Sequence, residues 1–253
     1  MTITLAAINR HPIKGLKAQS LESARLSPSK GLIGDRLFSL ARGSAGYSLP
    51  RQMPPAAISI LDLENEERLA KLEARYDDDS QTLQLLRSGQ ERPLAQARVD
   101  TPLGRSLISQ FFADFLGDSR RGLPRLIDSE EALGPSNWVS LINLASLKDV
   151  ERVARQKLDP ARLRANLWLE GAQAWEEREW NGCRFRLGGA VLQVTAPLEC
   201  SGSANVNPRE AQRDINLPLL MRKGFMHQQV GVQLTVLEGG RIQQGDRLQP
   251  FTQ

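Results

Sequence analysis

The sequence contains little cysteine, little histidine and few aromatic residues. Its 253 residues include two cysteines and two histidines, and aromatic residues make up 5% of the chain. Two cysteines cannot build a disulfide framework, so we expect a reducing, cytoplasmic environment. No apolar run approaches the length of a membrane span, and the N-terminus does not resemble a signal peptide, so we expect no membrane association. The sequence also lacks a P-loop, a dinucleotide-binding glycine motif before a helix, a G-x-S-x-G motif and the His/Cys spacing of zinc sites.

Charge is present in both signs and is spread along the chain. The formal net charge is only +4 at pH 7, and most of the cationic residues are arginine. A nucleic-acid-binding surface would require clustered basic residues with aromatic residues between them, and the sequence has no such cluster. Arginine suits bidentate contacts with phosphate or carboxylate. We therefore expect a small-molecule ligand, in particular a phosphorylated one, and not a nucleic acid.

Short apolar or alternating runs between glycine and proline turns dominate the chain. They predict strands at 3–8, 20–26, 37–40, 57–61, 138–142, 162–169, 191–195, 230–237 and 241–248, with a hairpin turn at 77–80 and another at 238–240. This pattern predicts a mainly β fold with a few helices, most simply a barrel.

Helical periodicity is restricted to a few segments. Residues 106–116 carry an amphipathic repeat that Gly117 should end, and residues 62–76 carry a weaker one. A third helix should start near Ser146, which resembles a capping residue, and stop before Pro160. The glycine- and charge-rich run after residue 117 predicts a boundary between a domain at 1–117 and a domain at 118–253.

Cys200 lies in a loop of small residues directly after the strand predicted at 191–195. We expect Pro197 to end that strand, because proline cannot donate to a sheet ladder. The sequence leaves two interpretations of Cys200 open: a ligand or nucleophile, or a buried inert thiol. Cys183, in a strand just after a turn, is interpreted as structural.

Several cationic residues lie where they could bind an anion. Lys14, Arg36 and Arg51 each stand at a strand edge beside glycine or proline, so together they could form a phosphate-binding rim, or each could be a solvated charge. Alternation at 162–169 would place Arg162 and Arg164 on one strand face, with Asn166 beside them, which favours ligand contact. Ser146 could bind an anion at its helix start or merely cap the helix.

Taken in order, these segments resemble the MOSC proteins (molybdenum cofactor sulfurase C-terminal domain), of the type with an N-terminal β-barrel region. The matching pieces are His11-Pro12-Ile13-Lys14-Gly15, Gly31-Leu32-Ile33-Gly34-Asp35-Arg36, Arg51-Gln52, Arg162-Leu163-Arg164-Ala165-Asn166-Leu167, Cys200 and Gly245-Asp246. The resemblance implies a MOSC-type β-barrel with an N-terminal β-rich subdomain.

The resemblance also implies a cofactor and a reaction. In amidoxime-reducing relatives the cysteine ligates the metal of a molybdenum cofactor, a pyranopterin with a phosphate tail. By that similarity Cys200 would be both the metal ligand and the catalytic residue. The set of cofactor-binding residues would be Lys14 and Arg36 at the phosphate, Arg164 and Asn166 at the pterin, and Ser146 at a helix start. The implied activity is that of an oxidoreductase that reduces N-hydroxylated small molecules. Pyridoxal phosphate binding is a further property associated with the family.

The chain departs from the family pattern around the cysteine. Glu199 stands where the family usually has arginine, and Ala204-Asn205 replaces Thr-Thr. A negative charge next to the cysteine disfavours a thiolate, which predicts altered substrate choice or weakened cofactor binding. The sequence has no cysteine-rich ferredoxin-like module, so a reductase of this kind would depend on an external electron-transfer protein. Two alternatives remain open: a sulfur carrier that uses Cys200 as a persulfide site, and an anion-binding domain without chemistry at Cys200.

Overall fold

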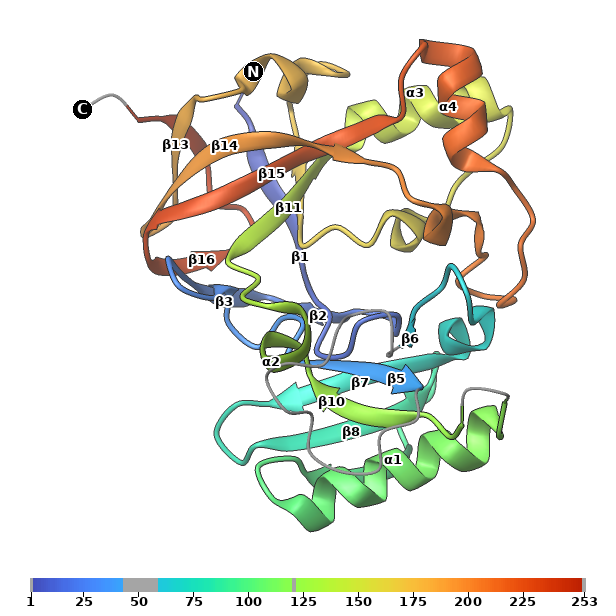
Figure 1. Ribbon diagram of the computed structural model, residues 1–253. Coiled ribbons are helices and arrows are strands. Elements are labelled where there is room, and N and C mark those ends of the chain that lie inside the picture. Colours follow the sequence, from blue (N-terminus) through green and yellow to red (C-terminus); the bar gives the residue numbers. More distant parts are fainter. Residues whose placement is uncertain (1, 43–58, 120–121, 252–253) are drawn as a thin grey trace.

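The computed structural model describes residues 2–42, 59–119 and 122–251 (Figure 1). Strands make up most of the regular structure, and the helices lie at its periphery. The prediction of a mainly β fold with a few helices is thus confirmed.

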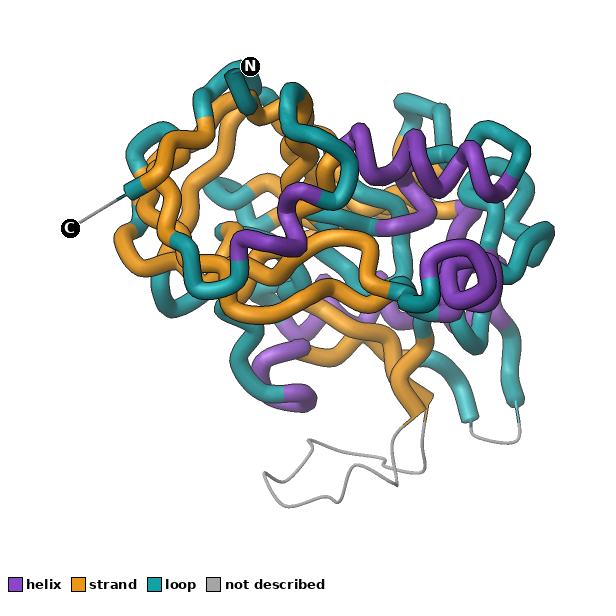
Figure 2. The backbone as a smooth tube through the Cα atoms, turned by 90° about the horizontal axis from the view of Figure 1, so that it is seen from above, coloured by secondary structure: helices purple, strands orange, loops and turns teal. Residues whose placement is uncertain are grey.

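The largest sheet has eight strands in the order β17-β13-β14-β15-β11-β12-β1-β2. Its strands are β1 (Thr4–Arg10), β2 (Gln19–Leu21), β11 (Trp138–Asn143), β12 (Leu167–Glu170), β13 (Arg184–Leu187), β14 (Ala190–Glu199), β15 (Gln229–Glu238) and β17 (Leu248–Pro250). Neighbours are antiparallel except β11 and β12, which run parallel. The sheet curls around its own apolar core, and both ends of the chain lie beside it (Figure 2).

Three smaller sheets complete the β structure. They are β10 (Arg125–Asp128) with β5 (Phe38–Arg42) and β6 (Ser59–Leu61); β16 (Gly240–Gln243) with β3 (Ser23–Ser27) and β4 (Gly31–Leu32); and β7 (Leu72–Asp77) with β8 (Thr82–Arg87) and β9 (Pro93–Arg98). The helices are α1 (Pro102–Leu116), α2 (Ser129–Leu133), α3 (Leu144–Ala154) and α4 (Leu217–Phe225), with 3₁₀ turns η2 (Glu67–Lys71), η3 (Pro160–Leu163), η4 (Glu176–Trp180) and η5 (Gly202–Asn205).

The buried apolar side chains form three clusters. One lies inside the curled sheet, one between that sheet and helices α3 and α4, and one among the sheets that contain β5 and β7 and helix α1. Cys200 belongs to the second cluster, whereas Val206 and Ala211, only a few residues later, belong to the third. The segment after Cys200 therefore ties the two parts of the molecule together. The boundary between 117 and 118 stays a prediction, because the chain crosses between these parts more than once.

Helix α1 follows the predicted periodicity closely. Thr101 caps it by accepting a hydrogen bond from the Gly104 amide at 3.1 Å. Gly117 ends it with φ +67°, a conformation that suits glycine because it has no Cβ. Ile108 and Phe112 are fully buried on its inner face, while Leu107 points outward and is 55% exposed.

Three local predictions were wrong. Residues 62–76 form only the short turn η2 and then strand β7, in which Leu72, Ala74 and Tyr76 alternate inward with the period of a strand. Pro197 does not end β14: the strand continues to Glu199 through a register shift, where proline is tolerated. The run 238–240 does not close a hairpin, since β16 pairs with β3.

The buried and exposed faces of α1 predict that two substitutions on this helix differ strongly in their effect on the free energy of unfolding. Phe112→Ala removes a fully buried ring and should lower the free energy of unfolding by about 3–5 kcal/mol. Leu107→Ala, on the exposed face of the same helix, should change it by only about 0.5 kcal/mol or less. Urea unfolding followed by circular dichroism measures both values, and equal losses would contradict the assignment of the buried face.

Candidate functional site

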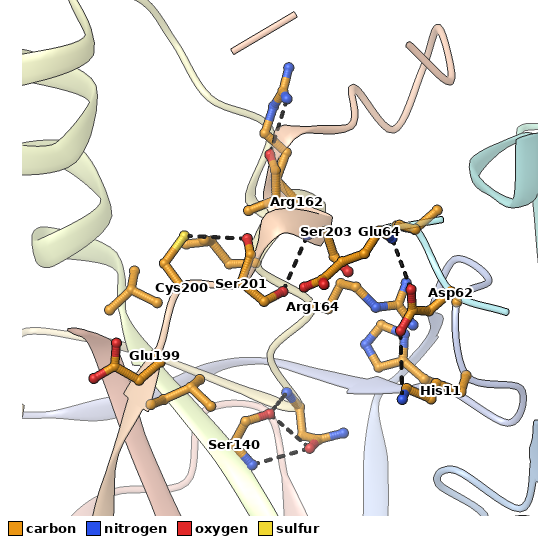
Figure 3. A pocket seen from close by; sticks show the side chains of 18 of the residues that line it. His11, Asp62, Glu64, Ser140, Arg162, Arg164, Glu199, Cys200, Ser201 and Ser203 are labelled. Carbon is orange, nitrogen blue, oxygen red and sulfur yellow. Dashed lines mark hydrogen bonds and ion pairs between the residues drawn. The ribbon is translucent and has the colours of Figure 1, made fainter. Parts of the chain in front are cut away.

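A cleft of about 360 Å³ opens between the curled sheet and the N-terminal segments. Its volume lies at the lower end of the range of small-molecule sites, roughly 300–1,000 Å³. Every predicted site residue except Ser146 lines it: Lys14, Arg36, Arg164, Asn166 and Cys200. Figure 3 shows the cysteine loop on one side of this cleft and His11 with Arg164 on the other.

Cys200 is placed by the end of β14. Its amide donates a hydrogen bond to the Gln228 carbonyl at 2.8 Å, and turn η5 follows directly. The residue is only 3% exposed. Burial, reinforced by the negative charge of Glu199, raises the pKa of the Cys200 thiol to about 12. The group is therefore a protonated thiol at neutral pH, as the neighbouring glutamate led us to expect.

Arg162 fixes the loop that carries Cys200. Its guanidinium donates to the carbonyl oxygens of Ala204 at 3.3 Å and Asn205 at 3.4 Å, and pairs with Asp214 at 2.6 Å. The prediction of a strand with Arg162 and Arg164 on one face was wrong. Pro160 starts the turn η3 instead, and Arg164 adopts a left-handed conformation with φ +54° that turns its side chain elsewhere.

Arg164 is the cation with most unused donors in the cleft. Its Nη1 donates to the Leu16 carbonyl at 2.6 Å, and its other nitrogens contact no acceptor among the residues described. Burial lowers the pKa of Arg164 to about 10, and the carboxylates of Asp35 and Asp62 offset part of that change. A desolvated guanidinium with free donors is suited to bind an anion.

Arg36 and Lys14 also line the cleft. Arg36 lies 3.9 Å above the Trp138 ring, donates to the Trp138 carbonyl at 2.9 Å and pairs with Asp35 at 2.6 Å. These contacts fix its orientation. Lys14 is freer, because its nearest carboxylate, Asp62, lies 3.7 Å away. Arg51 lies outside the described residues.

The side-chain amide of Asn166 is already engaged by the scaffold. Its Oδ1 accepts hydrogen bonds from the amide of Ser140 at 3.1 Å and the hydroxyl of Ser140 at 2.9 Å. Its Nδ2 donates to the Asn9 carbonyl at 3.1 Å. Asn166 thus joins β1 to β11 beneath the cleft, and its contact with a ligand stays a prediction.

Ser146 does not reach the cleft, so its placement at the binding site was wrong. It is fully buried, donates to Glu177 Oε1 at 2.6 Å and accepts from the Trp175 amide at 2.8 Å. Nor does it cap the helix: Asn143 occupies that position and accepts from the Ala145 amide at 3.0 Å. The Ser146 hydroxyl thus uses both its donor and its acceptor function within the protein.

His11 is a lining residue that the sequence interpretation passed over. The residue is 6% exposed, and its Nε2 has no hydrogen-bond partner in the described part of the chain. Burial, together with the positive charges of Arg164 and Arg36, lowers the pKa of His11 well below its ordinary value, so the imidazole is neutral. Its position in the same short motif as Lys14 was the signal that could have identified it.

Neither a metal-binding cluster of side chains nor a membrane-spanning helix is found in the described part of the chain. Over residues 2–42, 59–119 and 122–251, no three His, Cys, Asp or Glu side chains gather as a metal-binding group. Within the same ranges no helix is long and apolar enough to cross a membrane.

Two family models match the chain, one in each half. The MOSC domain matches residues 128–249, and the MOSC N-terminal beta barrel domain matches residues 2–119. A comparison with curated proteins finds no match.

Similar solved structures include two YiiM proteins and a YuaD protein. YiiM from Geobacillus stearothermophilus is 17% identical, with 45% of this chain and 54% of YiiM covered and a TM-score of 0.37. YuaD from Bacillus subtilis is 12% identical, with 100% and 98% covered and a TM-score of 0.49. YiiM from Escherichia coli is 20% identical, with 46% and 54% covered and a TM-score of 0.34. The chain therefore spans about half the length of the YiiM proteins.

The two cysteines should differ sharply in reactivity. Cys183 is exposed, whereas Cys200 is buried and protonated. At about pH 8 the folded, ligand-free protein should react quickly with one equivalent of a disulfide reagent such as DTNB, because the thiolate is the reactive form. Cys183→Ala should abolish this fast phase, and the second thiol should react only after unfolding. Fast modification of Cys200 in the folded Cys183→Ala protein would contradict the burial.

The buried carboxyl that binds Ser146 predicts a pH effect on stability. Burial raises the pKa of Glu177 above its ordinary value of 4.5, so the native state holds the proton more tightly than the unfolded chain. The contribution of Glu177 is then fully present below pH 4.5 and is lost as pH rises through the raised native pKa.

Unfolding free energies of wild type and Glu177→Gln, measured across that pH range, test this sign. The stability of wild type relative to Glu177→Gln should fall with rising pH, by about 1.4 kcal/mol for each unit by which the pKa is raised. Glu179→Gln, the same substitution at an exposed neighbouring position, is the matched control. A rise instead of a fall would contradict the buried environment.

Proposed function

The chain belongs to the MOSC family, and from this membership and its cleft we propose that it binds a molybdenum cofactor beside Cys200. We propose further that it reduces N-oxygenated small molecules in the cytoplasm with electrons from an external donor protein. The observation that carries the proposal is that Cys200, Arg164, Arg36 and Lys14 line one cleft although they are far apart in the sequence.

The anionic end of the cofactor suits the cations of the cleft. Arg164 keeps unused donors, and its desolvation is best compensated by an anionic partner. Arg36 is oriented by Trp138 and Asp35, and Lys14 stands at the opening with weak pairing. These three side chains would hold the phosphate and the edge of the pterin.

Cys200 suits the metal end of the cofactor on the condition that the thiol loses its proton. A soft thiolate is an appropriate ligand for a redox-active metal, and coordination displaces the thiol proton. Because burial and Glu199 raise the pKa of Cys200 to about 12, loading must overcome this preference for the neutral thiol.

The protein's own contribution is to position the reacting groups and to limit water. When bound, the molybdenum centre would supply two-electron oxygen-atom transfer. Arg162 keeps the cysteine loop in place, and Leu198 and Val230 give the cleft an apolar wall close to Cys200. The apolar wall and the fixed loop favour a single orientation of the substrate near the thiol.

Metal and pterin analysis of protein from a cofactor-competent host tests this proposal. Wild type should contain about one molybdenum per chain, together with a pterin that fluoresces after oxidation, because the site offers one soft ligand and one anion-binding end. Cys200→Ala should lose most of the metal. Cys183→Ala removes the exposed cysteine instead and should retain it. Wild type free of both molybdenum and pterin would contradict the proposal.

The sulfur-carrier alternative makes a different prediction for the same protein. A persulfide on Cys200 adds the mass of one sulfur, which a reductant removes, and involves no reductase activity. Intact-protein mass spectrometry before and after reduction therefore distinguishes the two functions. Pyridoxal phosphate binding stays a prediction of the family resemblance.

A further inference from the structure

Helix α4 covers the apolar cluster in which Cys200 is buried. Leu217 and Met221 on its inner face are fully buried and belong to the same cluster as Cys200. Gly224 lies close against α3, since a Cβ there would come within 2.5 Å of Val153 Cγ1. The inner face of α4 is therefore used by the core, and the helix lies at the outside of the molecule beside α3 (Figure 1).

The outer face of α4 combines exposed apolar and cationic side chains. Leu219, Arg222, Lys223 and Met226 follow one another at the spacing i, i+3, i+4, i+7, which places them on one face; we call them the α4 patch. Leu219 is 41% exposed and Met226 is 88% exposed, and both cations are exposed as well. Neighbouring exposed apolar side chains with charged residues between them are typical of an interaction surface.

Met226 occupies a position that favours glycine. It ends α4 in the left-handed conformation, with φ +63°, and its amide donates to the Arg222 carbonyl at 3.0 Å. A side chain with a Cβ is disfavoured in this conformation, which is why helices often end with glycine here. Packing within the protein does not explain the methionine, because its side chain is almost wholly exposed. A flexible thioether is, however, well suited to contact a partner.

The positive charge of the α4 patch is not balanced locally. Residues 215–229 contain Arg222 and Lys223 and no aspartate or glutamate. Neither cation forms an ion pair within the described part of the chain. Glu199, opposite Gln229 in the β14–β15 ladder, is a carboxylate at the far end of this segment. The helix end of the segment thus complements an acidic protein surface.

A membrane surface fits this helix less well than a protein does. An interfacial membrane helix inserts a broad apolar face between the lipids. The broad apolar face of α4, with Leu217 and Met221, is instead packed on the core, and the outer face alternates apolar and cationic side chains.

A short path joins the α4 patch to the cysteine loop. Gln228 follows Met226 by two residues, and its carbonyl accepts a hydrogen bond from the Cys200 amide at 2.8 Å. The intervening His227 stacks on Phe225, with 5.9 Å between the ring centroids. An electron that enters at the patch would therefore have a covalent and hydrogen-bonded route to Cys200.

We propose that the α4 patch docks an acidic electron-transfer protein and is the place where electrons enter. This inference rests on the proposed function and specifies the class and the docking surface of its partner. Reduction of one N–OH group to N–H takes two electrons and two protons and releases water. Two one-electron carriers in succession would supply the electrons, and solvent would supply the protons. A small patch is sufficient, because weak electron-transfer encounters bury less than about 1,200 Å².

Two small electron-transfer proteins of opposite charge serve as probes for docking. Binding of acidic plant-type ferredoxin and basic cytochrome c is measured by calorimetry at low ionic strength, on wild type purified from a cofactor-competent host. Ferredoxin should bind, more weakly as salt is added, and cytochrome c should not. Arg222→Glu combined with Lys223→Glu should weaken ferredoxin binding about tenfold. The matched control, Arg87→Glu with Arg92→Glu at two exposed arginines around the end of β8, should not.

Met226→Gly separates docking from folding. Glycine suits the left-handed conformation, so the thermal stability of this variant should equal or exceed that of wild type. Its affinity for ferredoxin should fall about fivefold, because the apolar contact is lost. Unchanged affinity would overturn the role of Met226 in docking.

Turnover with two electron donors tests electron entry. In molybdenum-loaded protein with benzamidoxime as the N-hydroxylated substrate, the Arg222 and Lys223 double variant should slow turnover driven by reduced ferredoxin about tenfold. Turnover driven by reduced methyl viologen, a small molecule that needs no protein docking surface, should stay unchanged. Equal ferredoxin-driven rates in wild type and the double variant would overturn the assignment of electron entry to this patch.

The outcomes separate this inference from the proposed function. Wild type that fails to bind ferredoxin, binds cytochrome c as tightly, or keeps its ferredoxin affinity in the double variant would overturn the docking. Binding to phosphatidylserine vesicles in place of ferredoxin would also overturn it. Protein that binds ferredoxin through the α4 patch but contains neither molybdenum nor pterin would support the docking and overturn the cofactor assignment.

Discussion

The position of Cys200 depends on how the segment after it is fixed. Arg162 binds two carbonyl oxygens of this segment and pairs with Asp214, while Val206 and Ala211 pack into the core around α1. The Cys200 side chain itself packs against α3 and α4. A loop of small residues is thus anchored in two cores, which gives the thiol a defined location although the local sequence has little propensity for regular structure.

This anchoring places the thiol in a cleft that several cationic side chains line. Arg164, Arg36 and Lys14 line this cleft together with Cys200, and Arg162 holds the loop that carries the thiol. The low local polarity that raises the pKa of Cys200 also strengthens each charge interaction in its neighbourhood. A ligand with an anionic end and a soft metal at its other end would match this lining.

The sequence predicted much of the fold and part of the site, for identifiable reasons. Helix α1 and the turn between β7 and β8 follow from local periodicity and turn residues, whereas β7 itself was predicted as part of a helix. The motifs carrying Lys14, Arg36, Arg164 and Cys200 were sufficient to bring these residues to one cleft in the prediction and in the structure.

The remaining features depend on tertiary contacts that periodicity does not encode. Arg162 turns away from Arg164 because a 3₁₀ turn and a left-handed residue replace the expected strand. Ser146 is drawn inward by Glu177, a partner 31 residues away. Pro197 stays within a strand because a register shift accommodates it. In each case a long-range partner decides the outcome.

We propose above that one cleft holds an anionic metal cofactor with its metal at Cys200. Anomalous diffraction from crystals of the loaded protein, recorded on both sides of the molybdenum absorption edge, tests it most directly. We expect a single anomalous peak within bonding distance of the Cys200 sulfur, with density for the phosphate beside Arg164. A molybdenum peak anywhere else on the protein, with Cys200 still buried and unligated, would contradict it.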